Sequence, residues 1–199
     1  MELSLVEKDA LREIINISFG LSASLIGDMI DEYVDLQVPN IETIPIYKLH
    51  DTIVNSLEKP GSIFVTKQRF FGDFSGEVLF SFSRESAKSF AALLVGEECD
   101  DEKEIEGSIL ELTNILTATC IGKLCEIVDT KSLFAVPDVQ KISSSGSSAL
   151  HEALEYDNAI VITTILDVAK QNIQAYMFIL FNNKMLTKLL KTLKESSLC

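Results

Sequence analysis

The chain has 199 residues, of which 47% are hydrophobic and 24% are charged, and its formal net charge is −13. This composition predicts a packed globular protein rather than a disordered one, and the length suits one domain. The strong negative charge argues against electrostatic binding of nucleic acid or of an anionic membrane surface, because both require clustered Lys and Arg.

The first half of the chain predicts a long helix, a strand, a hairpin and a second helix. Alternating apolar residues over 33–38 predict the strand, and Pro39 is expected to end it. Residues 61–70 and 76–83 predict two antiparallel strands joined by a turn. Ser83 and Gly96 are typical start and stop signals for the helix that follows. The long first helix is predicted to bury one apolar stripe, made of Val6, Ala10, Ile14, Ile17, Leu21, Leu25 and Met29.

The second half repeats this order after an acidic segment at 97–107, which is interpreted as a solvated connection. A second long helix is predicted from about Glu104 to Val128, followed by a strand that ends near Pro137. The Ser- and Gly-rich segment 143–156 predicts a loop with one helical turn. Strands are expected at 159–169 and 173–181, and a last helix from about Lys184 to Leu193.

Comparing the chain with itself at an offset of 98 shows an internal repeat. The repeat predicts a single α+β domain over 1–199 with pseudo-twofold symmetry, built from repeats at about 5–98 and 103–197. We expect the halves to share one mainly antiparallel sheet with the long helices packed on it. Between 13 and 44, seven residues meet an identical partner in the second half: Glu13, Asn16, Ile17, Asp31, Val38, Pro39 and Ile44.

The most informative repeated motif is Glu-x-x-Asn, which lies on both predicted long helices. Residues three apart share one helix face, so each Glu and Asn project together. A single copy would be ascribed to a solvated helix face. Each motif belongs to a row that ends in a small residue, where another surface can approach closely; the two rows are Asp9, Glu13, Asn16, Gly20 and Gly107, Glu111, Asn114, Ala118.

Both copies are followed by a proline 23 residues after the Asn, at Pro39 and Pro137. About 0.01 random copies of this extended pattern are expected in such a composition, so two copies are not accidental. Duplication of one structural unit explains the shared Pro, Ile and Val. It explains less well why an exposed Glu and Asn stayed together while their neighbours diverged.

The pattern Asp9, Glu13, Asn16 and Pro39 resembles the signature of the CheC/CheX/FliY phosphatases of bacterial and archaeal chemotaxis. The segment 38–49, VPNIETIPIYKL, also resembles the family sequence after its first active helix. Two motifs in a chain of this length are typical of the CheC branch. The resemblance implies a cytoplasmic phosphatase of the phosphorylated response regulator CheY, and it also implies binding to the receptor deamidase CheD.

The resemblance assigns catalytic positions to Glu13, Asn16, Glu111 and Asn114. An aspartyl phosphate is hydrolysed by in-line attack of water, so catalysis is mostly positioning and electrostatics. A carboxamide orients water without bringing negative charge to the phosphoryl oxygens, so each Asn is the expected water-positioning residue. Each Glu is expected to dock a cationic side chain of the regulator. No cofactor is expected in this chain, since magnesium would belong to the regulator.

Two departures from the family pattern concern the motif neighbours. Gly107 stands where the family has Asp or Ser, and Ile15 and Thr113 stand where members often have Gly. The larger residues at 15 and 113 either change the approach of the regulator or pack inward. Pro39 and Pro137 are interpreted as structural, setting the turn after each strand.

Other candidate sites are weaker. Cys99, Cys120, Cys125 and Cys199 form no C-x-x-C pair, which favours buried or free thiols in a reducing compartment over a zinc site or a disulfide framework. The two histidines, at 50 and 151, lack triad partners, and the Ser-rich loop lacks the Lys of a phosphate-binding loop. We expect neither a signal peptide nor membrane insertion. The alternative function is a non-catalytic adaptor that binds CheD or a response regulator.

Overall fold

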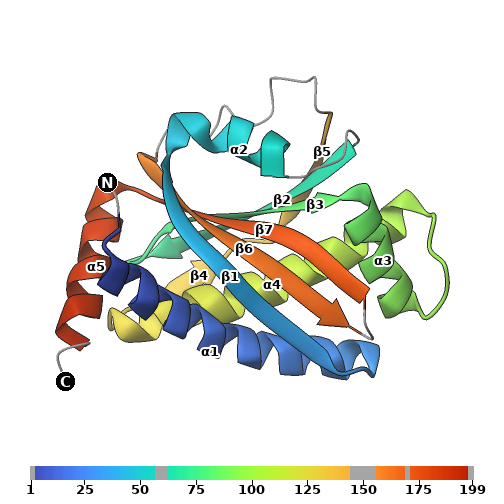
Figure 1. The fold of residues 1–199 in the computed structure, drawn as a ribbon, viewed down its shortest axis with the longest axis horizontal. Coiled ribbons are helices and arrows are strands. Elements are labelled where there is room, and N and C mark those ends of the chain that lie inside the picture. Colours follow the sequence, from blue (N-terminus) through green and yellow to red (C-terminus); the bar gives the residue numbers. More distant parts are fainter. Residues whose placement is uncertain (1–2, 57–61, 144–155, 169–170, 197–199) are drawn as a thin grey trace.

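The computed structural model describes residues 3–56, 62–143, 156–168 and 171–196 (Figure 1). Its elements follow the predicted order, with two short helices added after the first strand and with two strands, one on each side of Pro137, where one was predicted in the second half. They are α1 (Leu5–Ile30), β1 (Val34–Pro45), η1 (Ile46–Lys48), α2 (Leu49–Ser56), β2 (Ser62–Gly72), β3 (Gly76–Ser83), α3 (Arg84–Val95), α4 (Glu102–Ile127), β4 (Ser132–Phe134), β5 (Asp138–Ser143), β6 (Asn158–Val168), β7 (Gln171–Phe181) and α5 (Asn183–Ser196).

The strands form one seven-stranded antiparallel sheet in the order β1-β6-β7-β3-β2-β4, with β5 also paired to β2. This order is symmetric about the β7–β3 pair. The first strand of each half pairs with the hairpin of the other half, so each half completes the other's sheet. The predicted α+β fold with pseudo-twofold symmetry is therefore confirmed, and the long helices α1 and α4 are its equivalent pair.

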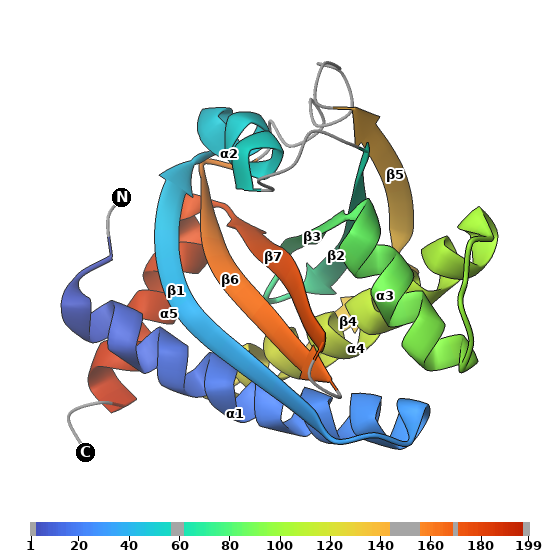
Figure 2. The same cartoon turned by 45° about the vertical axis from the view of Figure 1, so that its right-hand side comes forward.

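Both faces of the sheet are covered, which follows from the alternation of side chains along each strand. On β3, Val78, Phe80 and Phe82 face the main core, which lies beneath α1, α3, α4 and α5. Leu79 faces the opposite way, into a smaller core closed by Leu49 and Ile53 of α2. Figures 1 and 2 show α1 and α4 side by side on one face, running in opposite directions, with α2 on the other face.

Helix α1 begins where the sequence permits but buries a different face from the one predicted. Ser4 and Glu7 form a reciprocal capping box, which satisfies free backbone N–H groups at the helix start. Three members of the predicted apolar stripe are about half exposed: Ile17, Leu21 and Leu25 are 49%, 56% and 51% accessible. The buried face shares Ile14 with the predicted stripe and is made of Glu7, Leu11, Ile14, Ile15, Ser18, Phe19, Ser22 and Ile26.

The prediction of the buried face of α1 was wrong because serine side chains occupy buried positions, and the spacing of apolar residues does not reveal them. Ser18 and Ser22 are fully buried and donate to the carbonyls of Ile14 and Ser18, one turn earlier. Such bonds satisfy the hydroxyl within the helix, so serine can pack at a tight interface. The hydroxyls of Ser22 and Thr119 also meet between α1 and α4.

Pro39 does not end its strand, contrary to the prediction. Strand β1 continues to Pro45, with a register shift between Gln37 and Asn40 in its pairing with β6. A proline lacks the N–H that a ladder needs, so a bulge is the position where a strand tolerates it. In the second half, Pro137 falls in the gap between β4 and β5. Both prolines therefore mark an interruption of pairing at the same place.

The remaining predictions have mixed outcomes. The hairpin β2–β3 and helix α3 are confirmed, with Ser83 accepting from the Ser86 N–H and Gly96 closing the helix at φ 84°. The strands β6 and β7 and helix α5 are also present. The short helices η1 and α2 were not predicted. Most of the predicted loop at 143–156 lies outside the described residues.

Candidate active site

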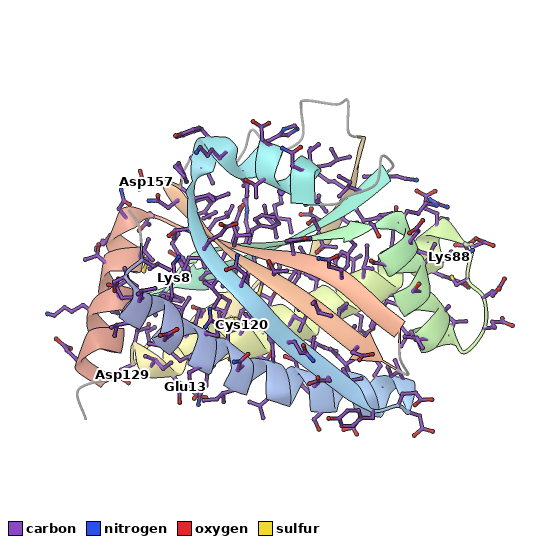
Figure 3. The ribbon with its side chains drawn as sticks, viewed as in Figure 1. Lys8, Glu13, Lys88, Cys120, Asp129 and Asp157 are labelled. Atoms are coloured by element: carbon purple, nitrogen blue, oxygen red, sulfur yellow. The ribbon has the colours of Figure 1, made fainter. Side chains whose placement is uncertain are left out.

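Glu13 and Asn16 lie on the exposed side of α1, one turn apart. Figure 3 shows Glu13 on the side of the helix that is turned away from the sheet. The buried face of α1 fixes this direction, because Ile15 and Phe19 are fully buried. Asp9, earlier in the row, is also exposed and lies 3.4 Å from Arg12. The predicted polar row is therefore present on the helix surface.

Gly20, at the end of this row, leaves the helix surface open. A Cβ built at Gly20 would meet nothing within 4 Å. The same is true of Gly107, at the start of the second row. Neither glycine is required by packing within the chain, and neither has a positive φ. The open space beside Gly20 would let another molecule approach α1 next to Asn16.

Glu111 and Asn114 occupy the corresponding exposed positions on α4. Their surroundings differ from those of the first pair. The Oδ1 of Asn114 accepts a hydrogen bond from Gln68 Nε2 on β2, at 2.9 Å, and the same Nε2 donates to the Ala135 carbonyl, at 2.9 Å. Sequence analysis missed Gln68, since nothing in a lone Gln within an alternating strand indicates a partner 46 residues away.

The residues between Glu and Asn in the two motifs pack inward. Ile15 and Thr113 are both fully buried, so neither obstructs the outer surface. Thr113 donates its hydroxyl proton to the Ile109 carbonyl at 2.7 Å, so Thr66 must donate in the 2.6 Å contact between the two threonine hydroxyls. A polar contact thus joins α4 to β2 beneath the second motif, where the first motif places an apolar side chain.

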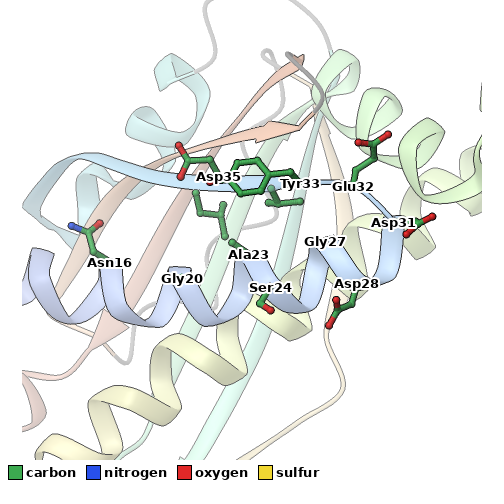
Figure 4. A pocket seen from close by; sticks show the side chains of 12 residues that line it. Asn16, Gly20, Ala23, Ser24, Gly27, Asp28, Asp31, Glu32, Tyr33 and Asp35 are labelled. Carbon is green, nitrogen blue, oxygen red and sulfur yellow. The ribbon is translucent and has the colours of Figure 1, made fainter.

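A wide groove of about 820 Å³ runs between α1 and the start of β1 (Figure 4). Asn16 stands at one end of this groove, and Gly20 lies along its wall. The carboxylates of Asp28, Asp31 and Glu32 lie toward the other end, Asp35 lies on β1 between the two ends, and none of the residues that line the groove is basic. The first motif therefore opens onto a strongly negative depression.

Other chemistry has little support among the described residues. Cys99, Cys120 and Cys125 are free and buried, and burial raises the pKa of Cys120 to about 12, so this thiol is not a nucleophile near neutral pH. Within the described ranges, no three His, Cys, Asp or Glu side chains are grouped to hold a metal ion. His50 lies 3.4 Å from Asp51 on α2, across the sheet from both motifs. Cys199 and His151 are outside the described residues.

Helix α1 is the one described helix whose length and composition would allow it to cross a bilayer. In this fold it packs one face against α4 and β1, and its buried residues belong to the main core. A core helix of a folded domain passes the same test of length and composition.

Comparisons with known proteins relate the chain to chemotaxis. Residues 64–154 match the family described as chemotaxis phosphatase CheX, a span that includes the second motif. The chain is 28% identical to the CheY-P phosphatase CheC of Bacillus subtilis over 187 residues, covering 87% of each protein. It is 32% identical to the flagellar motor switch phosphatase FliY of the same organism over 95 residues, which are 48% of this chain and 24% of FliY.

The fold has a close counterpart among solved structures. The crystal structure of FliY from Thermotoga maritima superposes with a TM-score of 0.76, covering 98% of this chain and 99% of that chain, at 14% sequence identity. At this identity the likeness establishes the fold alone.

Proposed function

We propose that this chain is a member of the CheC/CheX/FliY family of chemotaxis phosphatases and that it hydrolyses the aspartyl phosphate of a CheY-type response regulator. The observation that carries the proposal is the duplicated pair of side chains on the two long helices. Glu13 with Asn16, and Glu111 with Asn114, are exposed on helices whose other face is buried in the shared core. A purely structural duplication would not require these four polar side chains at the surface.

Each Asn is suited to orient the attacking water. The water attacks phosphorus in line, the new P–O bond forms as the bond to the aspartyl oxygen breaks, and inorganic phosphate leaves while the carboxylate is restored. The transition state is loose, so geometry and charge decide the rate. The oxygen of a carboxamide accepts a hydrogen bond from the water, and its NH₂ group donates one to a phosphoryl oxygen. Neither contact adds negative charge.

Each Glu is proposed to hold the regulator rather than to act on phosphorus. A carboxylate near the phosphoryl group would repel it, whereas a carboxylate one helical turn away can pair with a cationic side chain of the regulator. Magnesium would be carried by the regulator, where the phosphoryl oxygens are coordinated. The net charge of −13 favours a partner that presents basic residues to this surface.

We further propose a cytoplasmic location, which a CheY-type partner requires. Binding to CheD is a separate proposal that the family resemblance implies, and no described surface identifies it. The alternative from another class is a non-catalytic adaptor that uses the same helices to hold the regulator or CheD.

A phosphate-decay assay separates the enzyme from the adaptor. The regulator is labelled with a small phosphodonor, and its dephosphorylation is followed with wild type, Asn16→Ala, Asn114→Ala and the double variant. We expect wild type to accelerate decay, each single variant to retain part of the acceleration, and the double variant to lose it. Binding of the regulator without any acceleration of its dephosphorylation would refute the phosphatase proposal and support the adaptor function. Full activity in the double variant would refute the assignment of the Asn residues.

A further inference from the structure

Gln68 is a buried polar side chain that reaches the second motif from β2. Only 1% of its surface is exposed, and its Nε2 contacts both Asn114 and Ala135. Its own Oε1 is buried and has no hydrogen-bond partner within the described part of the chain. An orphaned buried carbonyl oxygen costs stability. A packed apolar residue would serve the core better, so the value of Gln68 lies in what its Nε2 holds.

The Ala135 carbonyl determines how the two amides are oriented. A carbonyl oxygen only accepts, so the Gln68 atom that faces it must be Nε2. That same Nε2 faces Asn114, so Asn114 must present Oδ1 to it and turn Nδ2 outward. The Oδ1 of Asn114 keeps a second acceptor direction for a water molecule. The Ala135 carbonyl thus sets the orientation of the Gln68 amide, and through it that of the exposed Asn114 carboxamide.

The first motif lacks this arrangement. Lys67 pairs with Asp138 across β2 and β5, and Thr163 pairs with Asn40 across β6 and β1. Since Asp138 is the repeat equivalent of Asn40, Thr164 is the equivalent of Gln68. Thr164 is buried, and its hydroxyl has no hydrogen-bond partner among the described residues.

Asn16 correspondingly makes no side-chain hydrogen bond to any residue that the structure describes. We propose that Gln68 is a positioning residue of the second site, which holds the Asn114 carboxamide in the orientation that catalysis requires. This inference rests on the proposed phosphatase function. The second site is then preorganised, whereas Asn16 loses its side-chain freedom only when the regulator binds. Ordering one side chain accounts for about a 2- to 10-fold effect on kcat/KM.

Side-chain amide NMR tests the contact without any assay of activity. In wild type, the heteronuclear NOE of the Asn114 Nδ2 group is expected to be higher than that of Asn16, a comparison that needs no variant. Gln68→Met keeps the length of the side chain and removes the hydrogen-bond donor. The heteronuclear NOE of the Asn114 amide should then fall to the value measured for Asn16. Equal mobility of the two amides in wild type would overturn the proposal.

Kinetics in single-site backgrounds test the consequence. With Asn16→Ala, only the second site is active, and adding Gln68→Met should lower kcat/KM about 2- to 10-fold. The matched control is Thr164→Val with Asn114→Ala, which removes the unpaired hydroxyl at the equivalent position and should leave first-site activity unchanged. An Asn114 amide that becomes mobile without a fall in kcat/KM would overturn the positioning role. A fall in kcat/KM with the amide still ordered would overturn it as well.

The two readouts separate this inference from the proposed function. If wild type does not accelerate dephosphorylation, the phosphatase proposal fails, and the NMR comparison still decides whether Gln68 orders Asn114.

Discussion

Asp31 and Asp129 are equivalent residues at the ends of the two long helices, and both have a positive φ, of 55° and 49°. They are the two described residues other than glycine with such a backbone. The left-handed conformation lets the chain reverse after a helix, and Asp tolerates it better than most residues. An identical residue in this conformation at both positions is strong evidence that the halves are copies of one unit.

Replacing Asp31 is predicted to stabilise the fold. Asp31→Asn removes a negative charge beside the negative end of the α1 dipole and should add about 0.3–1 kcal/mol to the free energy of unfolding. Asp31→Gly also removes the Cβ from the left-handed position and should add about 0.5–1 kcal/mol more. Urea denaturation measures both. Asp31→Ala is the control, because it removes the charge and keeps the Cβ. A gain with Ala equal to that with Gly would contradict the role of φ.

Cys120 is predicted to make the fold weaken in alkali. Its pKa is about 12 in the folded chain and 9.0 in a solvated thiol, so the unfolded chain loses this proton first as pH rises. The contribution of the thiol to the free energy of unfolding is therefore complete below pH 9 and declines between pH 9 and 12, by about 1 kcal/mol at pH 10. Figure 3 shows Cys120 between the helices and the sheet.

The measurement is denaturation under reducing conditions at pH 8 and pH 10, for wild type and Cys120→Ala. The variant is less stable at both values because it leaves a cavity. The variant should nevertheless lose less stability than wild type between the two pH values, by about 1 kcal/mol. An identical loss would show that Cys120 does not titrate later in the folded chain.

The repeat made much of this fold predictable from sequence. At a constant offset of 98, the two halves align Glu13 with Glu111 and Asn16 with Asn114. The same repeat predicts that each half completes the other's sheet. Element types followed from periodicity, because long helices and hairpins have distinct apolar spacings. The prediction that Pro39 ends its strand was wrong, because sequence alone does not show whether a proline ends a strand or occupies a bulge.

The hydrogen-bond partners of side chains could not be predicted from the sequence. The hydrogen bond from Gln68 to Asn114 joins two elements whose relative register is set only by packing. The buried face of α1 was also missed, because Ser18 and Ser22 are polar by type yet are satisfied within the helix. The halves look alike in sequence motif but differ in what supports each Asn, and only tertiary contacts reveal that difference.

Gly20→Ala is predicted to stabilise the chain and to impair the first site. Alanine favours a helix over glycine by about 0.5–1 kcal/mol, and the free chain has space for its methyl group. If the regulator docks against this surface, the methyl group overpacks the contact and lowers kcat/KM at least about fivefold. The assay uses the Asn114→Ala background. Gly107→Ala, which also adds a methyl group in open space, should leave first-site activity unaltered. Full activity of Gly20→Ala would argue against close docking at Gly20.

The exposed apolar residues of α1 are predicted to contact the regulator at the first site. Ile17 follows Asn16 directly, and Leu21 and Leu25 continue along the same side of the helix, each about half exposed. The equivalent positions on α4 hold Ile115, Thr119 and Lys123, so this apolar ridge belongs to one site only. Such a ridge beside Asn16, the proposed water-positioning residue, is suited to bury apolar area when a partner binds.

Leu21→Gln tests that ridge. Because Leu21 is largely outside the core, the free energy of unfolding should change by no more than about 0.5 kcal/mol. Losing the burial of half a leucine side chain costs about 1 kcal/mol of binding, so KM in the Asn114→Ala background should rise about fivefold with kcat little changed. Tyr47→Gln is the control, since Tyr47 is 76% exposed in η1, away from both motifs. An unchanged KM for Leu21→Gln would place the regulator elsewhere on α1, and a fall in kcat alone would indicate that Leu21 supports Asn16 rather than the partner.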